Sequence, residues 1–561
     1  MHMKQSLLVS LSLAFALQAC AGGPAVSTAP TRAPTATGPN GATRPQPSVA
    51  LGVPAIPTLK ALTAAPEDWQ RLSPESDGVF GVGSERALTD LLNGKTPTRR
   101  VIVAVIDGGV DTAHTSLVAN LWHNTKETIN GKDDDGDGLI DDDLGWNYAG
   151  GANLKSVNAE SFEVTRIYAA CVGAPAGRGT PKPDAARCDK IKSDYDKKKT
   201  ETTTQVAQIT SFIQTSNAVA AVLQRAMNTQ TLTRSAVDAY KPNGEQNAQA
   251  RDIWLQIEAT GLLGTAAEAA LSNAQDQVKY SLDINYDSRI IVGDNISDLS
   301  EKLYGNRDVT GPDASHGTHV AGIIGAARSG GTVQGIAPSV QIMAVRAVPN
   351  GDERDKDIAN AIRFAVDHGA HIINMSFGKS YSPGKSAVDA AAKYAESKGV
   401  LMVHAAGNDG ENIDVNPSFP SVVLESKERV NNWLEVGASS WKGLGELAAE
   451  FSNYGRTRVD LFAPGVDILS TVPGGGTKRE SGTSMAAPVV SGVAALLMSY
   501  FPTLTAADVR EILIASARRI DVQVVKPGGT GKASFAALSS SGAVIDAYAA
   551  VKMAQARAVL K

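Results

Sequence analysis

Cysteine is scarce in this chain, which has 3 cysteines in 561 residues. So few cysteines exclude a fold that depends on a disulfide framework, as small secreted domains do. An excess of charge is also lacking, because the formal net charge is −5 and the sequence pI is near 6.0. Such a balance gives no support to nucleic-acid binding or to a basic membrane-binding patch. The length instead provides material for two or three domains with a large core.

The N-terminal apolar segment is too short to cross a bilayer. Lys4 precedes the apolar residues 7–17, a pattern typical of an export signal. The segment ends in Leu17-Gln18-Ala19-Cys20, which resembles the lipobox of bacterial lipoproteins. That resemblance implies a lipid on Cys20, which would hold the protein on a membrane surface. Ala21 after the cysteine favours, by the same resemblance, the periplasmic or outer-membrane side of a Gram-negative envelope; the alternative is ordinary secretion.

Composition divides the chain into successive parts. Residues 1–20 form the predicted signal, and residues 21–66, rich in Pro, Thr, Ala and Gly, predict a disordered tether. Residues 67–154 predict a helical lead-in and the first part of a globular domain. Residues 155–282 predict an inserted helical subdomain, and residues 283–561 supply the remainder of the globular domain.

The inserted segment carries helical spacing and no catalytic motif. Its apolar residues recur every three to four positions, which predicts a helical hairpin or small bundle. Cys171 and Cys188 lie in its polar loop, and we expect them to pair in an oxidising periplasm. The positions behind the helical prediction are Val206, Ile209, Ile213 and Ala220, with N-caps expected at Thr233 and Thr265.

Strand and helix patterns alternate from His316 onward. This alternation predicts an α/β fold with a mostly parallel central sheet and helices on both faces. Active residues then gather at the carboxyl ends of the strands. We expect strands at Val101–Ile106, Val340–Val345, His371–Met375, Val400–Ala405 and Leu434–Gly437, and helices at Ile323–Ala327, Asp355–Asp367, Ser386–Ser397, Ser484–Phe501 and Ala506–Ala517, the last with Thr505 as N-cap.

A small-residue turn, Gly482 to Pro488, exposes the hydroxyl of Ser484 ahead of a buried central helix. The positive end of that helix suits a developing negative charge, and we expect Pro488 within its first turn. A serine alone is a weak nucleophile, so this interpretation needs a base and an orienting carboxylate. His316 and Asp107, which ends an apolar strand, provide both. Taken singly, each residue has an ordinary structural alternative: a turn residue for Asp107, a structural histidine for His316 and a helix cap for Ser484.

The motifs VAVIDGGVD, HGTHVAG, AAGN and GTSMAAP occur in the order Asp, His, Ser that subtilisin uses. On these motifs the chain resembles the subtilisin-like serine peptidases, or subtilases. The resemblance implies that Ser484 attacks a peptide carbonyl while His316 carries the proton and Asp107 orients the imidazole. No cofactor is expected for this catalysis.

The same resemblance supplies the remaining site residues. Asn408 matches the family's side-chain oxyanion donor, next to the backbone N–H of Ser484. Substrate would bind as an added strand. The residues expected along that cleft are Ser376, Phe377, Gly378, Ala405, Ala406 and Gly407.

An acidic loop between Asp107 and His316 suggests a metal ion. Its alternating carboxylates and Gly138 match the first half of an EF-hand loop, but Leu144 replaces the twelfth-position Glu. We therefore expect a structural Ca²⁺ without a full EF-hand, the alternative being a solvated acidic loop. The expected ligands are Asp133, Asp135, Asp137 and Asp141. His319 is expected to be structural, and His368 receives no role.

The predicted function is a serine endopeptidase for protein or peptide substrates, tethered outside the cytoplasm by a lipid anchor. Compact subtilases need a few dozen residues between the catalytic Asp and His, whereas 209 positions separate Asp107 and His316 here. Two alternatives stay open. One is a catalytically silent lipoprotein of subtilase fold that binds a partner through the insertion, and the other is a maturation peptidase for one exported substrate.

Overall fold

The structure is a computed structural model that describes residues 57–559, apart from residues 260, 262, 328–332 and 530. The predicted signal, Cys20 and most of the predicted tether lie outside the described residues.

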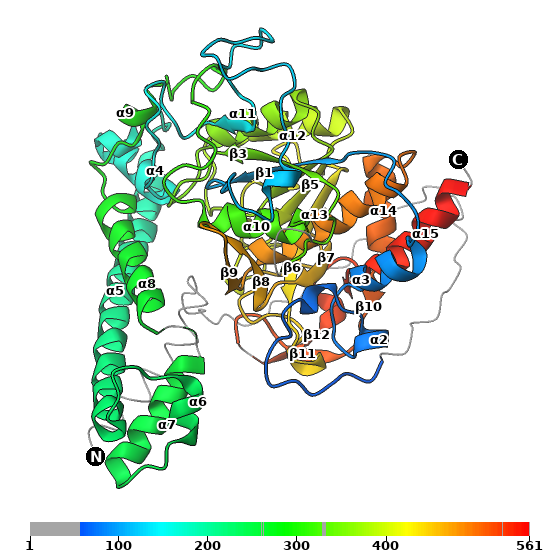
Figure 1. The fold of residues 1–561 in the computed structure, drawn as a ribbon. Coiled ribbons are helices and arrows are strands. Elements are labelled where there is room, and N and C mark those ends of the chain that lie inside the picture. Colours follow the sequence, from blue (N-terminus) through cyan, green and yellow to red (C-terminus); the bar gives the residue numbers. More distant parts are fainter. Residues whose placement is uncertain (1–56, 260, 262, 328–332, 530, 560–561) are drawn as a thin grey trace, which may run out of the picture.

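A nine-stranded sheet forms the centre of the molecule (Figure 1). Its strand order is β10-β13-β7-β6-β5-β4-β1-β3-β2, and every pair is parallel except β10 with β13. The predicted mostly parallel sheet is confirmed. Its strands are β1 (Ile102–Asp107), β2 (Gly145–Asn147), β3 (Gln341–Arg346), β4 (Ile372–Met375), β5 (Leu401–Ala405), β6 (Trp433–Ser439), β7 (Leu461–Pro464), β10 (Arg518–Arg519) and β13 (Ala543–Val544). Two hairpins pair β8 (Ile468–Val472) with β9 (Gly476–Glu480) and β11 (Gln523–Val525) with β12 (Lys532–Ser534).

Helices cover both faces of the sheet, as predicted. Side chains alternate along β1, so that Val103 and Val105 enter the core shared with α10, α13, α14 and α15, while Ala104 and Ile106 enter the core shared with α11 and α12. These helices are α10 (Ser315–Gly325), α11 (Asp355–Asp367), α12 (Lys385–Ser397), α13 (Thr483–Tyr500), α14 (Ala506–Ser516) and α15 (Ala547–Val559).

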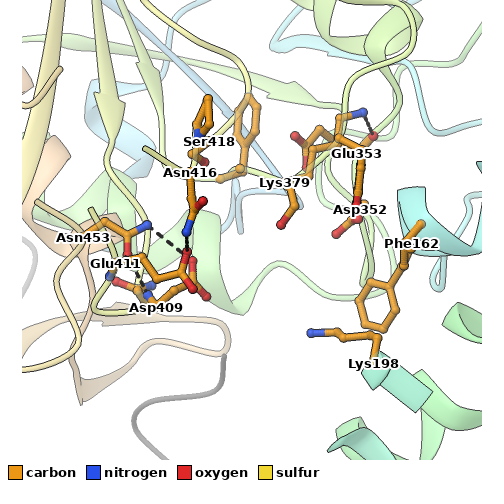
Figure 2. Close-up of a pocket in the computed structure, with 18 of the residues that line it drawn as sticks. Phe162, Lys198, Asp352, Glu353, Lys379, Asp409, Glu411, Asn416, Ser418 and Asn453 are labelled. Atoms are coloured by element: carbon orange, nitrogen blue, oxygen red, sulfur yellow. Dashed lines mark hydrogen bonds between the residues drawn. The ribbon is translucent and has the colours of Figure 1, made fainter. Parts of the chain in front are cut away.

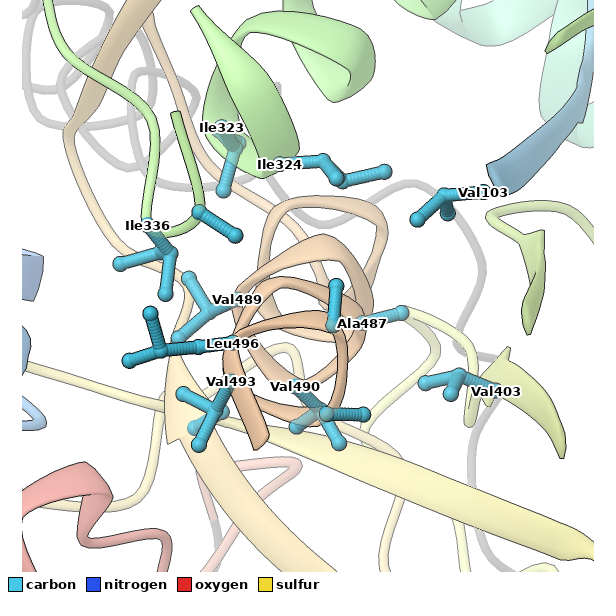
Figure 3. Packing of buried hydrophobic residues seen from close by; sticks show 14 of the residues in the cluster. Val103, Ile323, Ile324, Ile336, Val403, Ala487, Val489, Val490, Val493 and Leu496 are labelled. Atoms are coloured by element: carbon cyan, nitrogen blue, oxygen red, sulfur yellow. The ribbon is translucent and has the colours of Figure 1, made fainter. Parts of the chain in front are cut away.

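Helix α13 is the predicted buried central helix. Sixteen of its 18 residues are buried, and Figure 3 shows Val489, Val490, Val493 and Leu496 surrounded by side chains of other elements. Burial of each such side chain stabilises the folded protein by roughly 1.5–3 kcal/mol. By length and composition alone α13 could cross a membrane, but 89% of its most apolar window is buried in the protein. It is therefore a core helix of the domain.

Four predicted helix starts can be compared with the structure. Helix α10 begins at Ser315 and not at Ile323, because close packing overrides the low helix propensity of Gly317 and Gly322. Thr233 and Thr505 are N-caps as predicted. The Thr265 prediction is wrong, since Gly264 takes the N-cap position of α8.

The segment between β2 and α10 contains an arm of helices at one side of the sheet domain (Figure 1). Helix α5 has 43 residues and packs against α7 and α8. The expected pairing of Cys171 with Cys188 is confirmed by a disulfide that ties the end of α4 to the start of α5. Helix α5 also passes the length and composition test for a membrane span, with 22% of that window buried. The helices are α4 (Glu163–Val172), α5 (Ala185–Met227), α6 (Arg234–Ala239), α7 (Glu245–Ala259), α8 (Thr265–Asp276) and α9 (Arg289–Val292).

The predicted helical lead-in forms short helical segments that pack on the sheet domain. Trp69 is fully buried in the core that contains α13, and its indole N–H donates to the carbonyl oxygen of Val466 at 3.0 Å. The segments are η1 (Trp69–Arg71), α2 (Pro74–Asp77), α3 (Ser84–Arg86) and η2 (Ala87–Leu91). How the chain divides into domains stays a prediction.

Candidate active site

Polar residues gather at the carboxyl ends of three neighbouring strands. Asp107 is the last residue of β1, Ser376 follows β4, and Asn408 follows β5 by three residues. These strands lie side by side in the order β5-β4-β1. The chain adds β3 on one side of β1 and β4 on the other, so the direction in which successive strands are added reverses at β1. Open α/β sheets hold their ligands at such a point.

Asp107 and His316 form a close pair. Nδ1 of His316 lies 2.8 Å from Oδ1 and 3.0 Å from Oδ2 of Asp107. The carboxylate is 3% exposed and the imidazole 42% exposed. Gly317 makes this approach possible, because a Cβ there would lie 2.1 Å from the carbonyl oxygen of Gly109 and 3.1 Å from Oδ1 of Asp107. The small residue after the histidine is thus required by packing.

The pair changes the basicity of the imidazole. Burial lowers the pKa of His316, but the negative charge and the hydrogen bond of Asp107 outweigh burial and raise the pKa to about 9. A carboxylate at Nδ1 also keeps the proton on that nitrogen in the neutral ring, which leaves Nε2 as the acceptor. His316 is therefore arranged to accept a proton at Nε2.

Ser484 is the second residue of α13, which packs against α10. Its hydroxyl donates to the carbonyl oxygen of Ser376 at 3.1 Å. Across the part of the chain that the structure describes, no hydrogen bond joins Ser484 to His316. The carbonyl group of Ser376 is therefore the acceptor of this hydroxyl in the structure, and rotation about Cα–Cβ can bring the hydroxyl to another acceptor.

Pro488 lies in the second turn of α13, not in the first turn as predicted, because the helix already begins at Thr483. A proline inside a helix leaves the carbonyl group four residues earlier without its N–H partner. That carbonyl belongs to Ser484, and the hydroxyl of Ser376 donates to it at 2.9 Å. Ser376 therefore holds the backbone of Ser484 from the end of β4.

Asn408 lies directly beside the start of α13. Its side-chain oxygen accepts the backbone N–H of Thr483 at 2.8 Å and the hydroxyl of Thr483 at 3.0 Å. A Cβ at Gly482 would lie 3.5 Å from the side-chain amide nitrogen of Asn408 and 3.6 Å from the backbone nitrogen of Ser484. The two nitrogen atoms thus lie near the same point at the start of α13.

A cavity of about 720 Å³ opens beside Ser484 and Asn408 (Figure 2). Four of the predicted cleft residues line it, namely Phe377, Gly378, Ala405 and Gly407. The other two do not: Ser376 is 3% exposed and supports Ser484, and Ala406 is fully buried in a core cluster with Phe80.

The opposite wall of this cavity comes from helices α4 and α5. The sequence contained no signal for this, because helical spacing does not tell against which surface a helix packs. The wall residues are Phe162 and Val164 at the start of α4 and Asp194, Lys197, Lys198 and Glu201 on α5.

The acidic loop holds two groups of side chains whose ligand atoms lie within 4.8 Å of one another. Glu127, Asp133 and Asp135 form an all-carboxylate group, which fits the oxygen ligands that Ca²⁺ prefers. The second group is Asp135, Asp137 and His368. Burial and the neighbouring carboxylates Asp142 and Asp135 raise the pKa of Asp137.

The two groups differ from the expected ligand set at three residues: Asp141 is missing, and Glu127 and His368 are added. The carboxylate of Asp141 belongs to neither group, and it accepts the backbone N–H groups of Asn130 and Gly131 at 2.9 and 3.0 Å. Glu127 and His368 join the groups from outside the loop and were not predicted. Nε2 of His368 lies 3.1 Å from carboxylate oxygens of both Asp137 and Asp142.

The chain is similar in sequence to known proteins. The family model described as the subtilase family matches residues 98–540. A thermophilic serine proteinase from Bacillus sp. (strain AK1) is 43% identical over 187 residues, which is 33% of this chain and 43% of that protein. Subtilisin E from Bacillus subtilis (strain 168) is 37% identical over 210 residues, which is 36% of this chain and 51% of that protein.

Other similarities are more partial. The cell wall-associated protease of Bacillus subtilis (strain 168) is 36% identical over 41% of this chain and 24% of that protein. Among solved structures, the protease domain of PatA is 32% identical over 44% of this chain and 82% of that chain, with a TM-score of 0.36, too low to bear on the fold. The chain spans about half the length of the first curated relatives that it matches.

Proposed function

Because this chain belongs to the subtilase family, we propose that it is a serine endopeptidase that hydrolyses peptide bonds through Asp107, His316 and Ser484. The observation that carries the proposal is the Asp107–His316 pair, whose Oδ1 and Nδ1 atoms lie 2.8 Å apart. Asp107 ends β1, and His316 lies on α10, which packs against the serine-bearing helix α13. Protein or peptide substrates follow from this chemistry. Nothing in the charge of the chain favours nucleic acid.

The proposed reaction begins when the Ser484 hydroxyl leaves the carbonyl group of Ser376 and turns toward Nε2 of His316. The imidazole accepts the hydroxyl proton as Oγ attacks the substrate carbonyl carbon, and Asp107 stabilises the resulting cation. The backbone N–H of Ser484 and the side-chain amide of Asn408 donate to the oxyanion. His316 then returns the proton to the leaving amine, and water hydrolyses the acyl-enzyme by the reverse sequence.

A serine-directed fluorophosphonate probe tests the proposal. We expect covalent labelling of the wild type and none of Ser484→Ala, because the probe reacts with a serine activated by a neighbouring base. Gel fluorescence after a fixed exposure measures this. If neither protein is labelled, even after proteolytic activation, the proposal fails and the silent binding protein becomes the better interpretation.

We further propose that the acidic loop binds a structural Ca²⁺ through Glu127, Asp133 and Asp135. An ion that binds only the folded protein stabilises it by about 2.7 kcal/mol at a free concentration of ~100 times Kd. We therefore expect chelation by EGTA to lower the melting temperature of the wild type, and Asp135→Asn to remove most of that difference. Differential scanning calorimetry with and without Ca²⁺ measures the effect.

Asp134→Asn is the matched control for the calcium prediction. It removes the same charge from the same loop, but Asp134 belongs to neither ligand group and accepts from Thr128 and Asn130 instead. Its melting temperature should keep the calcium dependence of the wild type. A wild-type protein whose melting temperature ignores EGTA would rule out the site.

Export and a lipid on Cys20 complete the proposal. The signal-like residues 4–20 support it, and one relative is described as cell wall-associated. In cells fed an alkyne-tagged fatty acid, we expect the wild type to carry the tag and Cys20→Ser to lack it, while the double variant Cys171→Ser and Cys188→Ser retains it. A tag that survives in Cys20→Ser, or its absence from the wild type, would contradict lipidation.

A further inference from the structure

We propose that the inserted helices build part of the substrate cleft, and that the lobe of the cavity between α4–α5 and residues 351–353 takes a basic side chain of the substrate. This inference rests on the proposed peptidase function, because the cavity that it concerns also contains Ser484. It assigns a specificity role to an insertion that carries no catalytic residue.

The labelled residues that line the cavity fall into two groups (Figure 2). In Figure 2, Asp409, Glu411 and Asn453 lie at one side, beside Asn416 and Ser418. At the other side, Asp352, Glu353 and Lys379 face Phe162 and Lys198 of the insertion. We refer to this second part, defined by Phe162, Lys198, Asp352 and Glu353, as the insertion lobe. Substrate residues beyond the one next to Ser484 can therefore reach side chains of α4 and α5.

Negative charge predominates in the cavity walls. Six of the lining residues are acidic and three are lysines, which gives a formal charge of −3. Two of the lysines pair with carboxylates, and the third, Lys198, lies over an aromatic ring. Nζ of Lys379 lies 2.8 Å from Glu163 and 2.9 Å from Asp355, the ammonium of Lys198 lies 4.9 Å from the ring centre of Phe162, and Lys197 lies 3.9 Å from Glu201.

Glu353 is a buried carboxylate that forms no ion pair among the described residues, and the nearby charge of Lys379 only partly offsets the effect of burial on its pKa. The residue is 2% exposed and lines the cavity, and among the described residues its Oε1 has no hydrogen-bond partner. Arg166 and Lys379 both donate to its backbone carbonyl oxygen, at 3.0 and 2.7 Å, and not to its carboxylate. Burial raises the pKa of Glu353 to about 7. Burying such a charge is costly unless a cation pairs with it.

Asp352 adds a second carboxylate to the same lobe. One of its oxygens accepts the backbone N–H of Glu163 at 2.7 Å, which links it to the first turn of α4. Burial raises its pKa as well. An ammonium or guanidinium group is the substrate group that satisfies two adjacent carboxylates, by charge-assisted hydrogen bonds. The methylene stem of lysine or arginine would contact the ring of Phe162.

Buried ion pairs hold the insertion against the cleft. Arg166 of α4 pairs with Glu163 and donates to the backbone oxygen of Asp352 at 3.0 Å. Lys379, the residue after the cleft residue Gly378, pairs with Glu163 from the other side. These three charged side chains are at most 5% exposed. The insertion lobe is thus preformed, which lowers the cost of binding a side chain in it.

Peptide binding to the uncleaving variant Ser484→Ala provides the test. A set of otherwise identical peptides carries a single lysine at each position in turn, with glutamine at that position as reference, and fluorescence anisotropy gives each Kd. At one position we expect lysine to bind about 10- to 100-fold more tightly than glutamine, the usual range for a charge-assisted bond. Adding Glu353→Gln or Asp352→Asn should reduce that preference to about threefold or less.

Glu268→Gln in the same background is the matched control. It removes one exposed carboxylate from α8, away from the cavity, and should leave the lysine preference intact. Equal affinity for the lysine and glutamine peptides at every position, or a preference that survives in both cavity variants, would overturn the inference. Failure of the peptidase proposal would appear separately, as absent fluorophosphonate labelling of the wild type.

Discussion

Replacing Ser484 by alanine is expected to reduce kcat for peptide hydrolysis by about 10⁶-fold. In subtilisin, a member of the same family, removal of the nucleophile costs about 2 × 10⁶ in kcat, and we adopt that measured scale. The substitution removes the only proposed attacking atom but leaves the N–H donors and the cavity in place. A fluorogenic peptide assay measures the loss, with far-UV circular dichroism as the check on folding.

Ser499→Ala is the control for this substitution. Ser499 lies on the same helix and is buried, and its hydroxyl has no partner among the described residues. Its removal should leave kcat within about threefold of the wild type, because it touches neither the donors nor the His316 pair. A Ser484→Ala protein that retains more than a hundredth of the wild-type rate would contradict the assignment of Ser484 as nucleophile.

The second large effect is expected for Asp107→Asn, which should lower kcat by about 10⁴-fold at neutral pH, the loss known for the corresponding change in another Asp-His-Ser peptidase. The amide is nearly the same size, so packing against Gly317 is preserved. It can, however, donate to Nδ1 of His316, which favours the wrong tautomer. The rate of peptide hydrolysis and unchanged thermal stability at pH 7 together distinguish this from unfolding.

The pH profile of Asp107→Asn provides a separate readout. The base must be neutral, so kcat/KM of the wild type should rise as pH increases through the His316 pKa, which lies above the ordinary value of 6.5. Removing the carboxylate removes the attraction that raises this pKa, so the rise in kcat/KM should occur at lower pH in Asp107→Asn. If kcat/KM of Asp107→Asn rises at the same pH as in the wild type or at a higher pH, Asp107 does not set the basicity of His316.

The same pair contributes to stability with a definite sign. A histidine whose pKa is higher in the folded than in the unfolded protein stabilises the fold fully below its unfolded pKa. The contribution is lost as pH rises from about 6.5 to about 9. Since the imidazole is 42% exposed, solvent screening keeps this contribution small. The role of the pair is therefore tested mainly by kcat and by the pH dependence of kcat/KM.

The sheet and its helices were predictable because their patterns are dense and local. The six apolar residues before Asp107 are of the kind that form a strand covered on both faces, and α11 runs from Asp355 to Asp367 as predicted. Glycine-rich stretches gave the poorest boundaries. The HGTHVAG motif contains residues that weaken an isolated helix, yet α10 runs through it because Gly317 and Gly322 each allow a contact closer than any side chain permits.

The catalytic motifs could be recognised from sequence, but the support around them could not. Nothing local to Ser376 indicates that its hydroxyl replaces the N–H that Pro488 lacks, because the two residues are far apart in the chain and meet only in the fold. His368 joins the acidic loop for the same reason. The position of Phe162 opposite Asp352 likewise depends on how α4 is oriented, and no residue pattern encodes that orientation.

The 209 positions between Asp107 and His316 have a modest entropic consequence. Closing a loop costs about 0.6 kcal/mol more for each doubling of its length, so growth from a few dozen residues adds about 1.5 kcal/mol. Helices α5 to α8 contact mainly one another, which shortens the effective loop further. A chain of this topology can therefore exchange the outer wall of its cleft, and with it the choice of substrate, while the bond-breaking machinery stays untouched.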